Sequence, residues 1–208
     1  PFLRSLFWES DVSSAQLARL VGATLILISV SLRDRLSIAS AVLGIGLIVL
    51  SFPLMGHTRS HNGSVLLGAL LAVHLFVAVF WFGSLVPLLL CLRHGTAPAL
   101  GELLGAFSHL AVRLVPLLFG AGLVLAWVLL GSLSALLSTY ALLLLLKLTA
   151  AVVLLLLAAT NKHKLSPAVA AGDSGAMHAL RRSIAAELAL MILILAATAT
   201  MTTLYSPS

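Results

Sequence analysis

The sequence predicts an all-α protein, a polytopic bundle of about six membrane-spanning helices, and three observations support this prediction. Of the 208 residues, 61% are hydrophobic and only 9% are charged, and the mean hydropathy is +1.18. A soluble domain carries about a quarter charged residues, which this chain cannot supply. About six apolar stretches reach the ~20 residues that a helix needs to cross a bilayer. They lack the two-residue alternation of a transmembrane β-barrel, so the class is α-helical.

The six predicted spans follow one another along nearly the whole chain. We place them at Ala15–Leu32, Ser37–Met55, Ser64–Leu92, Leu103–Leu130, Leu133–Thr160 and Ser183–Leu204. Residues 1–14 mix aromatic and charged side chains, which is typical of a segment at the membrane interface, and residues 15–208 form the transmembrane domain. Residues 161–182, with Pro167 and two glycines, are expected to form a long basic loop. The chain begins at Pro1 without a signal-peptide pattern, so we expect a fragment of a longer protein.

The distribution of Lys and Arg predicts the orientation of these spans. Basic loops lie around Arg33, around Arg93 and from Lys162 to Arg182, and they alternate with loops that carry one Arg or no charge. By the positive-inside rule the basic loops are cytoplasmic, so both chain ends face outward. The net charge of +6 forms no stripe, so the expected partner is the lipid bilayer and not nucleic acid. Motifs of hydrolases and of nucleotide-driven pumps are missing, so we do not expect an enzyme.

Four side chains inside the predicted spans are costly in hydrocarbon and are therefore candidates for function: His74, Arg113, Lys147 and Glu187. Arg113 and Glu187 both fall in the inner half of their spans, so we expect them to form an ion pair. His74 and Lys147 lie at a similar depth, about 15 Å from the outer surface. A charged Lys beside His74 would repel a cation, so Lys147 is neutral or faces another helix, or else His74 is structural.

A group of Met and His residues follows the second span on the predicted outer side. Met55, His57 and His61 lie close together in sequence, and Met201 near the outer end of the sixth span could add a second thioether. Thioether and imidazole donors suit copper, whereas Mg²⁺ and Ca²⁺ require carboxylates, which this loop lacks. The alternative is that these are ordinary loop histidines and that His57 caps the second helix. The single cysteine, Cys91, excludes a disulfide framework and a thiolate cluster.

Several short motifs, in order along the chain, resemble those of the CopD copper-resistance family. They are Gly56-His57, His74, Phe80-Trp81-Phe82-Gly83-Ser84, Phe107-Ser108-His109-Leu110-Ala111, Lys147, Asn161, Leu180-Arg181-Arg182-Ser183 and Glu187. Two positions depart from the family pattern, because Ser84 replaces a Gly and His109 stands where Arg is usual. The family usually has about eight spans, so the resemblance implies that this chain is the C-terminal six-span portion.

The resemblance implies a multi-pass protein of the bacterial inner membrane that moves copper between periplasm and cytoplasm. Copper would bind at Met55, His57 and His61 on the periplasmic side, with His74 deeper, and a periplasmic carrier of the CopC type would deliver it. Both chain ends would then be periplasmic. Two alternatives stay open: a non-transporting membrane subunit that delivers or senses copper, and a haem-bearing electron carrier.

Overall fold

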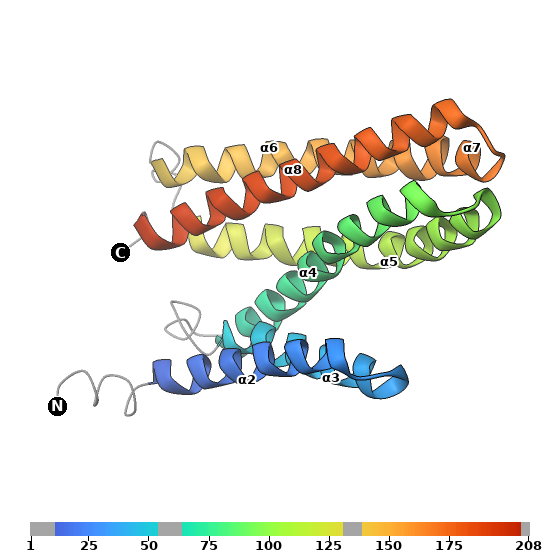
Figure 1. The fold of residues 1–208 in the computed structure, drawn as a ribbon. Coiled ribbons are helices and arrows are strands. Elements are labelled where there is room, and N and C mark those ends of the chain that lie inside the picture. Colours follow the sequence, from blue (N-terminus) through green and yellow to red (C-terminus); the bar gives the residue numbers. More distant parts are fainter. Residues whose placement is uncertain (1–10, 54–63, 131–138, 205–208) are drawn as a thin grey trace. The chain divides into compact units, whose positions relative to one another are not determined.

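The computed structural model describes residues 11–53, 64–130 and 139–204, and every described element is a helix (Figure 1). These elements are α2 (Asp11–Ser31), α3 (Asp34–Ser51), α4 (Ser64–His94), α5 (Ala97–Leu130), α6 (Thr139–Thr160), the π-helix η3 (Asn161–Leu165), α7 (Ser166–Ala170) and α8 (Ser174–Leu204). Strands are missing from the described ranges. The predicted all-α class is confirmed.

Six helical stretches of the described chain are long and apolar enough to cross a membrane. Their bounds are Ser13–Ser31, Asp34–Ser51, Val65–His94, Pro98–Val128, Ala141–Ala170 and Ser174–Leu204. Large apolar side chains stand exposed along them, for example Val65 at 86%, Val30 at 83% and Trp127 at 78%. Exposed apolar surface on this scale is unfavourable in water and favourable in lipid. The protein is therefore a multi-pass membrane protein, as the sequence predicts.

The helices divide into two compact units, which we describe separately. Unit 1 comprises residues 1–78 and 117–125, and unit 2 comprises residues 79–116 and 126–208. Helices α4 and α5 contribute to both units. Helix α4 belongs to unit 1 up to Ala78 and to unit 2 beyond it, and α5 belongs to unit 1 from Leu117 to Leu125 and to unit 2 elsewhere.

In unit 1, α2 and α3 form a tight helical hairpin (Figure 1). The helices cross at Gly22 and Gly44, where a Cβ on either residue would lie 2.6 Å from the carbonyl oxygen of the other. Only glycine permits this approach, which is how small residues bring helices together in a membrane. The turn between the helices places Asp34 at a φ of 55°, a conformation that few residues other than glycine adopt.

Polar side chains add hydrogen bonds across this hairpin. The Ser40 hydroxyl donates to the Leu25 carbonyl at 2.8 Å, and the Arg19 guanidinium donates to the Ser51 hydroxyl at 2.9 Å. Arg19 also lies over the ring of Phe52, 4.5 Å from its centroid. The charge of Arg19 is therefore satisfied by neutral partners within unit 1.

In unit 2, the connection between α6 and α8 is mostly helical, so the predicted loop at residues 161–182 is wrong. The chain continues from α6 through η3 and α7, and α8 already begins at Ser174. A short turn separates them, with Gly172 at a φ of 87°. The Asp173 carboxylate then accepts hydrogen bonds from the backbone N–H groups of Gly175 and Ala176 at 2.7 and 3.1 Å, which caps α8. As a result α6 and α8 pack side by side (Figure 1).

Helices α4 and α5 are also joined by a short turn in unit 2. Helix α4 continues to His94, where the Gly95 N–H donates to the Cys91 carbonyl at 2.7 Å, and α5 begins at Ala97 instead of Leu103. The rings of Phe80 on α4 and Phe107 on α5 stack with centroids 6.0 Å apart.

Candidate functional site

The five predicted metal ligands fall in three parts of the chain. Met55, His57 and His61 lie outside the described residues. His74 is partly buried on α4 in unit 1, and Met201 is buried on α8 in unit 2. Within the described ranges, no three His, Cys, Asp or Glu side chains gather in a way that could hold a metal ion. The copper site therefore remains a prediction.

His74 is held in a defined orientation by α5. Its Nδ1 lies 2.9 Å from the Leu118 carbonyl oxygen. A carbonyl only accepts hydrogen bonds, so Nδ1 carries a proton and donates it to Leu118; in a neutral imidazole of this tautomer Nε2 is the basic nitrogen. The imidazole fits against α5 because residue 122 is glycine: a Cβ there would lie 2.8 Å from His74 Cε1 and 3.0 Å from Nδ1. Metal-binding histidines commonly donate one ring N–H to a backbone carbonyl and bind the metal through the other nitrogen.

Lys147 is partly buried on α6, in unit 2. It belongs to a different unit from His74.

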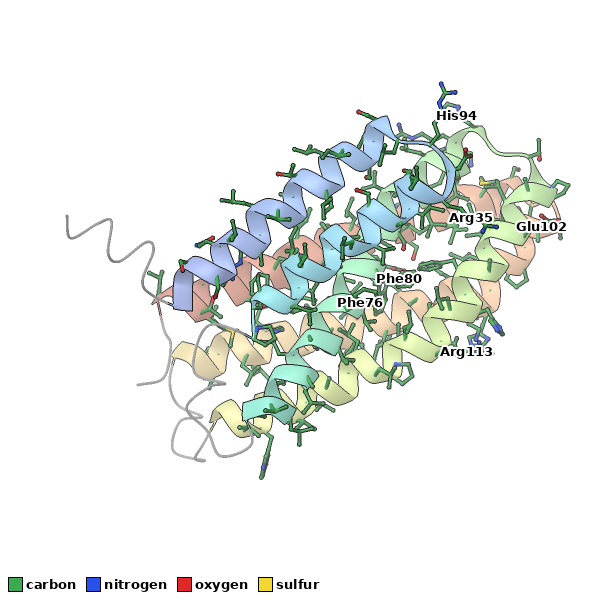
Figure 2. All side chains as sticks on the ribbon, turned by 90° about the horizontal axis from the view of Figure 1, so that it is seen from below. Arg35, Phe76, Phe80, His94, Glu102 and Arg113 are labelled. Carbon is green, nitrogen blue, oxygen red and sulfur yellow. The ribbon has the colours of Figure 1, made fainter. Side chains whose placement is uncertain are left out.

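Glu187 is the most deeply buried charged residue in the described part of the chain, at 3% exposure. Its Oε2 accepts a hydrogen bond from the Trp81 indole N–H at 3.3 Å, and its Oε1 accepts one from the Asn161 amide at 2.6 Å. Both donors are neutral. Arg113 is exposed on α5 and is not a partner of this carboxylate (Figure 2). The predicted Arg113–Glu187 ion pair is therefore wrong, because two neutral donors from α4 and η3 occupy the carboxylate instead.

Asn161 begins the π-helix and has one polar atom without a partner. Its side chain is 8% exposed, and its Nδ2 donates to Glu187, whereas its Oδ1 is buried and accepts no hydrogen bond. π-turns are rare and occur often at functional sites, because the widened turn changes the direction of a side chain or leaves a backbone group unpaired. Here the π-turn lies where Asn161 meets α8.

Trp81, Asn161 and Glu187 line one cavity of about 350 Å³ in unit 2. Its other walls are mostly apolar and come from α4, α5, α6 and α8. The remaining polar lining residues are Ser108, Lys162, His163 and Ser166. We call this space the Glu187 cavity.

Sequence reasoning named all three residues of this cluster but did not bring them together. Glu187 was singled out by its cost in hydrocarbon, while Trp81 and Asn161 appeared only as matches to family motifs. A buried carboxylate needs hydrogen-bond donors, so a search for neutral donors among those motifs could have found the pair.

Comparisons with known proteins identify one family. Residues 101–201 match the family model described as copper resistance protein D (CopD). Comparisons with curated proteins and with solved structures found no match. The matched range contains Lys147, Asn161, Glu187 and Met201, and it covers most of α5 and nearly all of α8. The resemblance seen in the short motifs is thus confirmed for this part of the chain, because residues 101–201 match the model of the CopD copper-resistance family.

Proposed function

We propose that this membrane protein moves copper between periplasm and cytoplasm across the bacterial inner membrane. The observation that carries the proposal is the match of residues 101–201 to the copper resistance protein D family. That match supports a copper-resistance role, and the transport step, its direction and its ligands are our proposal.

The proposed outer site consists of Met55, His57 and His61, with His74 as a deeper station and Met201 as a further thioether donor. Thioether and imidazole groups bind copper well and bind Mg²⁺ and Ca²⁺ poorly. Copper would pass from one station to the next by ligand exchange. A soluble periplasmic carrier of the CopC type could deliver the metal to the outer site, because the predicted orientation places the His57 loop on the periplasmic side.

The hydrogen bond from His74 Nδ1 to the Leu118 carbonyl supports the deeper station. It orients the imidazole through Nδ1, and a second hydrogen-bond partner that orients the ring is typical of a metal-binding histidine.

Copper uptake into proteoliposomes tests the proposal. The protein is reconstituted, and uptake and equilibrium binding of copper are compared between the wild type and a His57→Ala, His74→Ala double variant. Removal of a hydrogen-bond partner of a metal ligand already costs about 10–100-fold in affinity, so loss of the ligands themselves should cost at least about tenfold. His178→Ala is the matched control, since His178 is exposed and its Nδ1 lies 3.0 Å from the Ser174 carbonyl oxygen of its own helix.

The outcomes separate the competing functions. Full copper binding and uptake in the double variant would remove the Met/His site from consideration. Copper binding without uptake would point to a subunit that delivers or senses copper. An absorption spectrum with haem bands would support the electron carrier.

A further inference from the structure

A negative charge on Glu187 has no cation among its hydrogen-bond partners. The carboxylate is 3% exposed and is bound by the Trp81 indole and the Asn161 amide. Two neutral donors stabilise a carboxylate but leave its charge in place. In an apolar interior an uncompensated charge is expensive, so the site favours the arrival of a positive charge.

The partnerless oxygen of Asn161 adds a second acceptor to the same cavity. Because Nδ2 is fixed by its 2.6 Å hydrogen bond to Glu187, the amide cannot turn its oxygen to that carboxylate without losing the bond. The Oδ1 is buried without a donor, and both residues line the Glu187 cavity. Buried polar atoms are rarely left unpaired. The cavity thus presents a carboxylate and an amide oxygen, which together suit a cation.

The lining of the cavity determines which cation fits. Carboxylate and amide oxygens are hard ligands, and the lining contains neither a thioether nor a thiolate. Its one imidazole, from His163, is too few soft donors to make a Cu(I) site. Glu187 is the single carboxylate among the lining residues. Calcium sites collect several charged and carbonyl oxygens, and magnesium needs an octahedral set, so a divalent ion lacks ligands here.

Other titratable groups at the cavity come from one element. Lys162 and His163 of η3 line it, whereas α4 and α5 contribute none and α8 contributes only Glu187. Lys162 brings a positive charge to the same cavity, which repels a divalent ion about twice as strongly as a monovalent one. A volume of about 350 Å³ has room for a small ion with several water molecules.

We propose that Glu187 and Asn161 form a binding site for a small hard monovalent cation within the Glu187 cavity. The occupant is either Na⁺, coordinated by the carboxylate and the amide Oδ1, or a proton. In the second case hydronium transfers its proton to a Glu187 oxygen, an O–H bond forms, and water remains. The site differs in chemistry from the proposed copper site and shares no residue with it.

Trp81 makes this proposal measurable, because its indole N–H contacts the carboxylate directly. The protein has three tryptophans. Trp8→Phe and Trp127→Phe leave Trp81 as the one emitter in the full chain, reconstituted in lipid nanodiscs without copper. Sodium chloride is titrated against choline chloride at constant ionic strength and pH, and pH is then varied without sodium.

The expected result is a saturable change in Trp81 emission in one of the two series. A sodium site responds to Na⁺, with its midpoint moving to higher concentration as protons compete, and a proton site responds to pH alone. Glu187→Gln should abolish the response. Glu102→Gln is the matched control, because Glu102 is an exposed carboxylate of α5 in the same unit. Asn161→Ala should raise the half-saturating Na⁺ concentration about tenfold, by loss of one ligand.

A second readout does not depend on the indole. Radioactive sodium binding and the infrared band of a protonated carboxyl group are measured on the wild type and on Glu187→Gln. Sodium binding, or a titrating carboxyl band, that disappears in Glu187→Gln supports the site. If neither is present in the wild type, the proposal is overturned and an ordered water is sufficient for Asn161. Because no copper is used, this result is independent of the copper-transport test.

Discussion

Gly122→Ala should release the His74 side chain from α5, and the geometry gives the size of the effect. The added Cβ would lie 2.8 Å from His74 Cε1, whereas ordinary contact begins at 3.4 Å, so the ring must retreat by about 0.6 Å. Such a movement stretches the 2.9 Å bond from Nδ1 to the Leu118 carbonyl to the limit of hydrogen bonding. Overpacking costs about 1–3 kcal/mol and the lost hydrogen bond about 0.5–1.5 kcal/mol. We expect a destabilisation of about 1.5–4.5 kcal/mol relative to an alanine at an open position of the same helix.

Gly120→Ala is the control, because it makes the same change on the same helix where a Cβ would meet nothing within 4 Å. It isolates the gain of about 1 kcal/mol in helix propensity that both variants share. The free energy of unfolding is measured by titrating mixed micelles with SDS and following helicity. In a His74→Ala background the difference between the two variants should shrink to within about 0.5 kcal/mol. Equal stability of the two variants, or a penalty that persists without the imidazole, would refute the reasoning.

Three further predictions concern the rest of the fold. Gly22→Ala should cost about 1–3 kcal/mol in the same unfolding assay, since its Cβ meets a backbone carbonyl at 2.6 Å. Gly46→Ala, with nothing within 4 Å, should instead gain up to about 1 kcal/mol in helix propensity, and equal effects would contradict the observed crossing of α2 and α3. Glu187→Leu should lower the free energy of unfolding by about 1–3 kcal/mol for each of the two buried donors that it leaves unpaired, whereas Arg113→Met should be tolerated. A comparable loss of stability in both variants would support an Arg113–Glu187 ion pair after all. Ser174→Cys, in a background without the native cysteine, should react with a membrane-impermeant maleimide only after the cells are opened, and labelling in intact cells would reverse the predicted orientation.

The number of spans and their order could be predicted because apolar length is a strong and local signal. Each predicted span overlaps a helix that is long and apolar enough to cross a membrane. The helix ends were less accurate, especially at residues 161–182. Hydropathy falls where the chain leaves the lipid, but a helix does not end there unless something terminates it. Here α8 begins at its cap, Asp173, whose role depends on the three-dimensional turn around Gly172.

The candidate site was harder to predict, and Glu187 shows why. Its cost in hydrocarbon indicates that it must have partners, and that inference was correct. The choice of Arg113 followed from charge and estimated depth, which do not specify the face of a helix on which a side chain lies. The true partners, Trp81 and Asn161, are neutral, so a search for opposite charges overlooks them. The outer Met/His residues lie outside the described ranges and stay a sequence prediction.

The π-helix at Asn161–Leu165 makes the exact number of residues important at this point of the chain. A π-turn holds one residue more than an α-turn within about the same rotation of the chain. Deletion of one residue here would let α6 continue into α7 as a regular helix, with the helix faces before and after the turn nearly unchanged. The change would be confined to the turn, where Asn161 would be held by a narrower backbone and its amide would change direction relative to Glu187. Relatives with a one-residue gap here should therefore keep the helix order and differ in the contact between these two side chains.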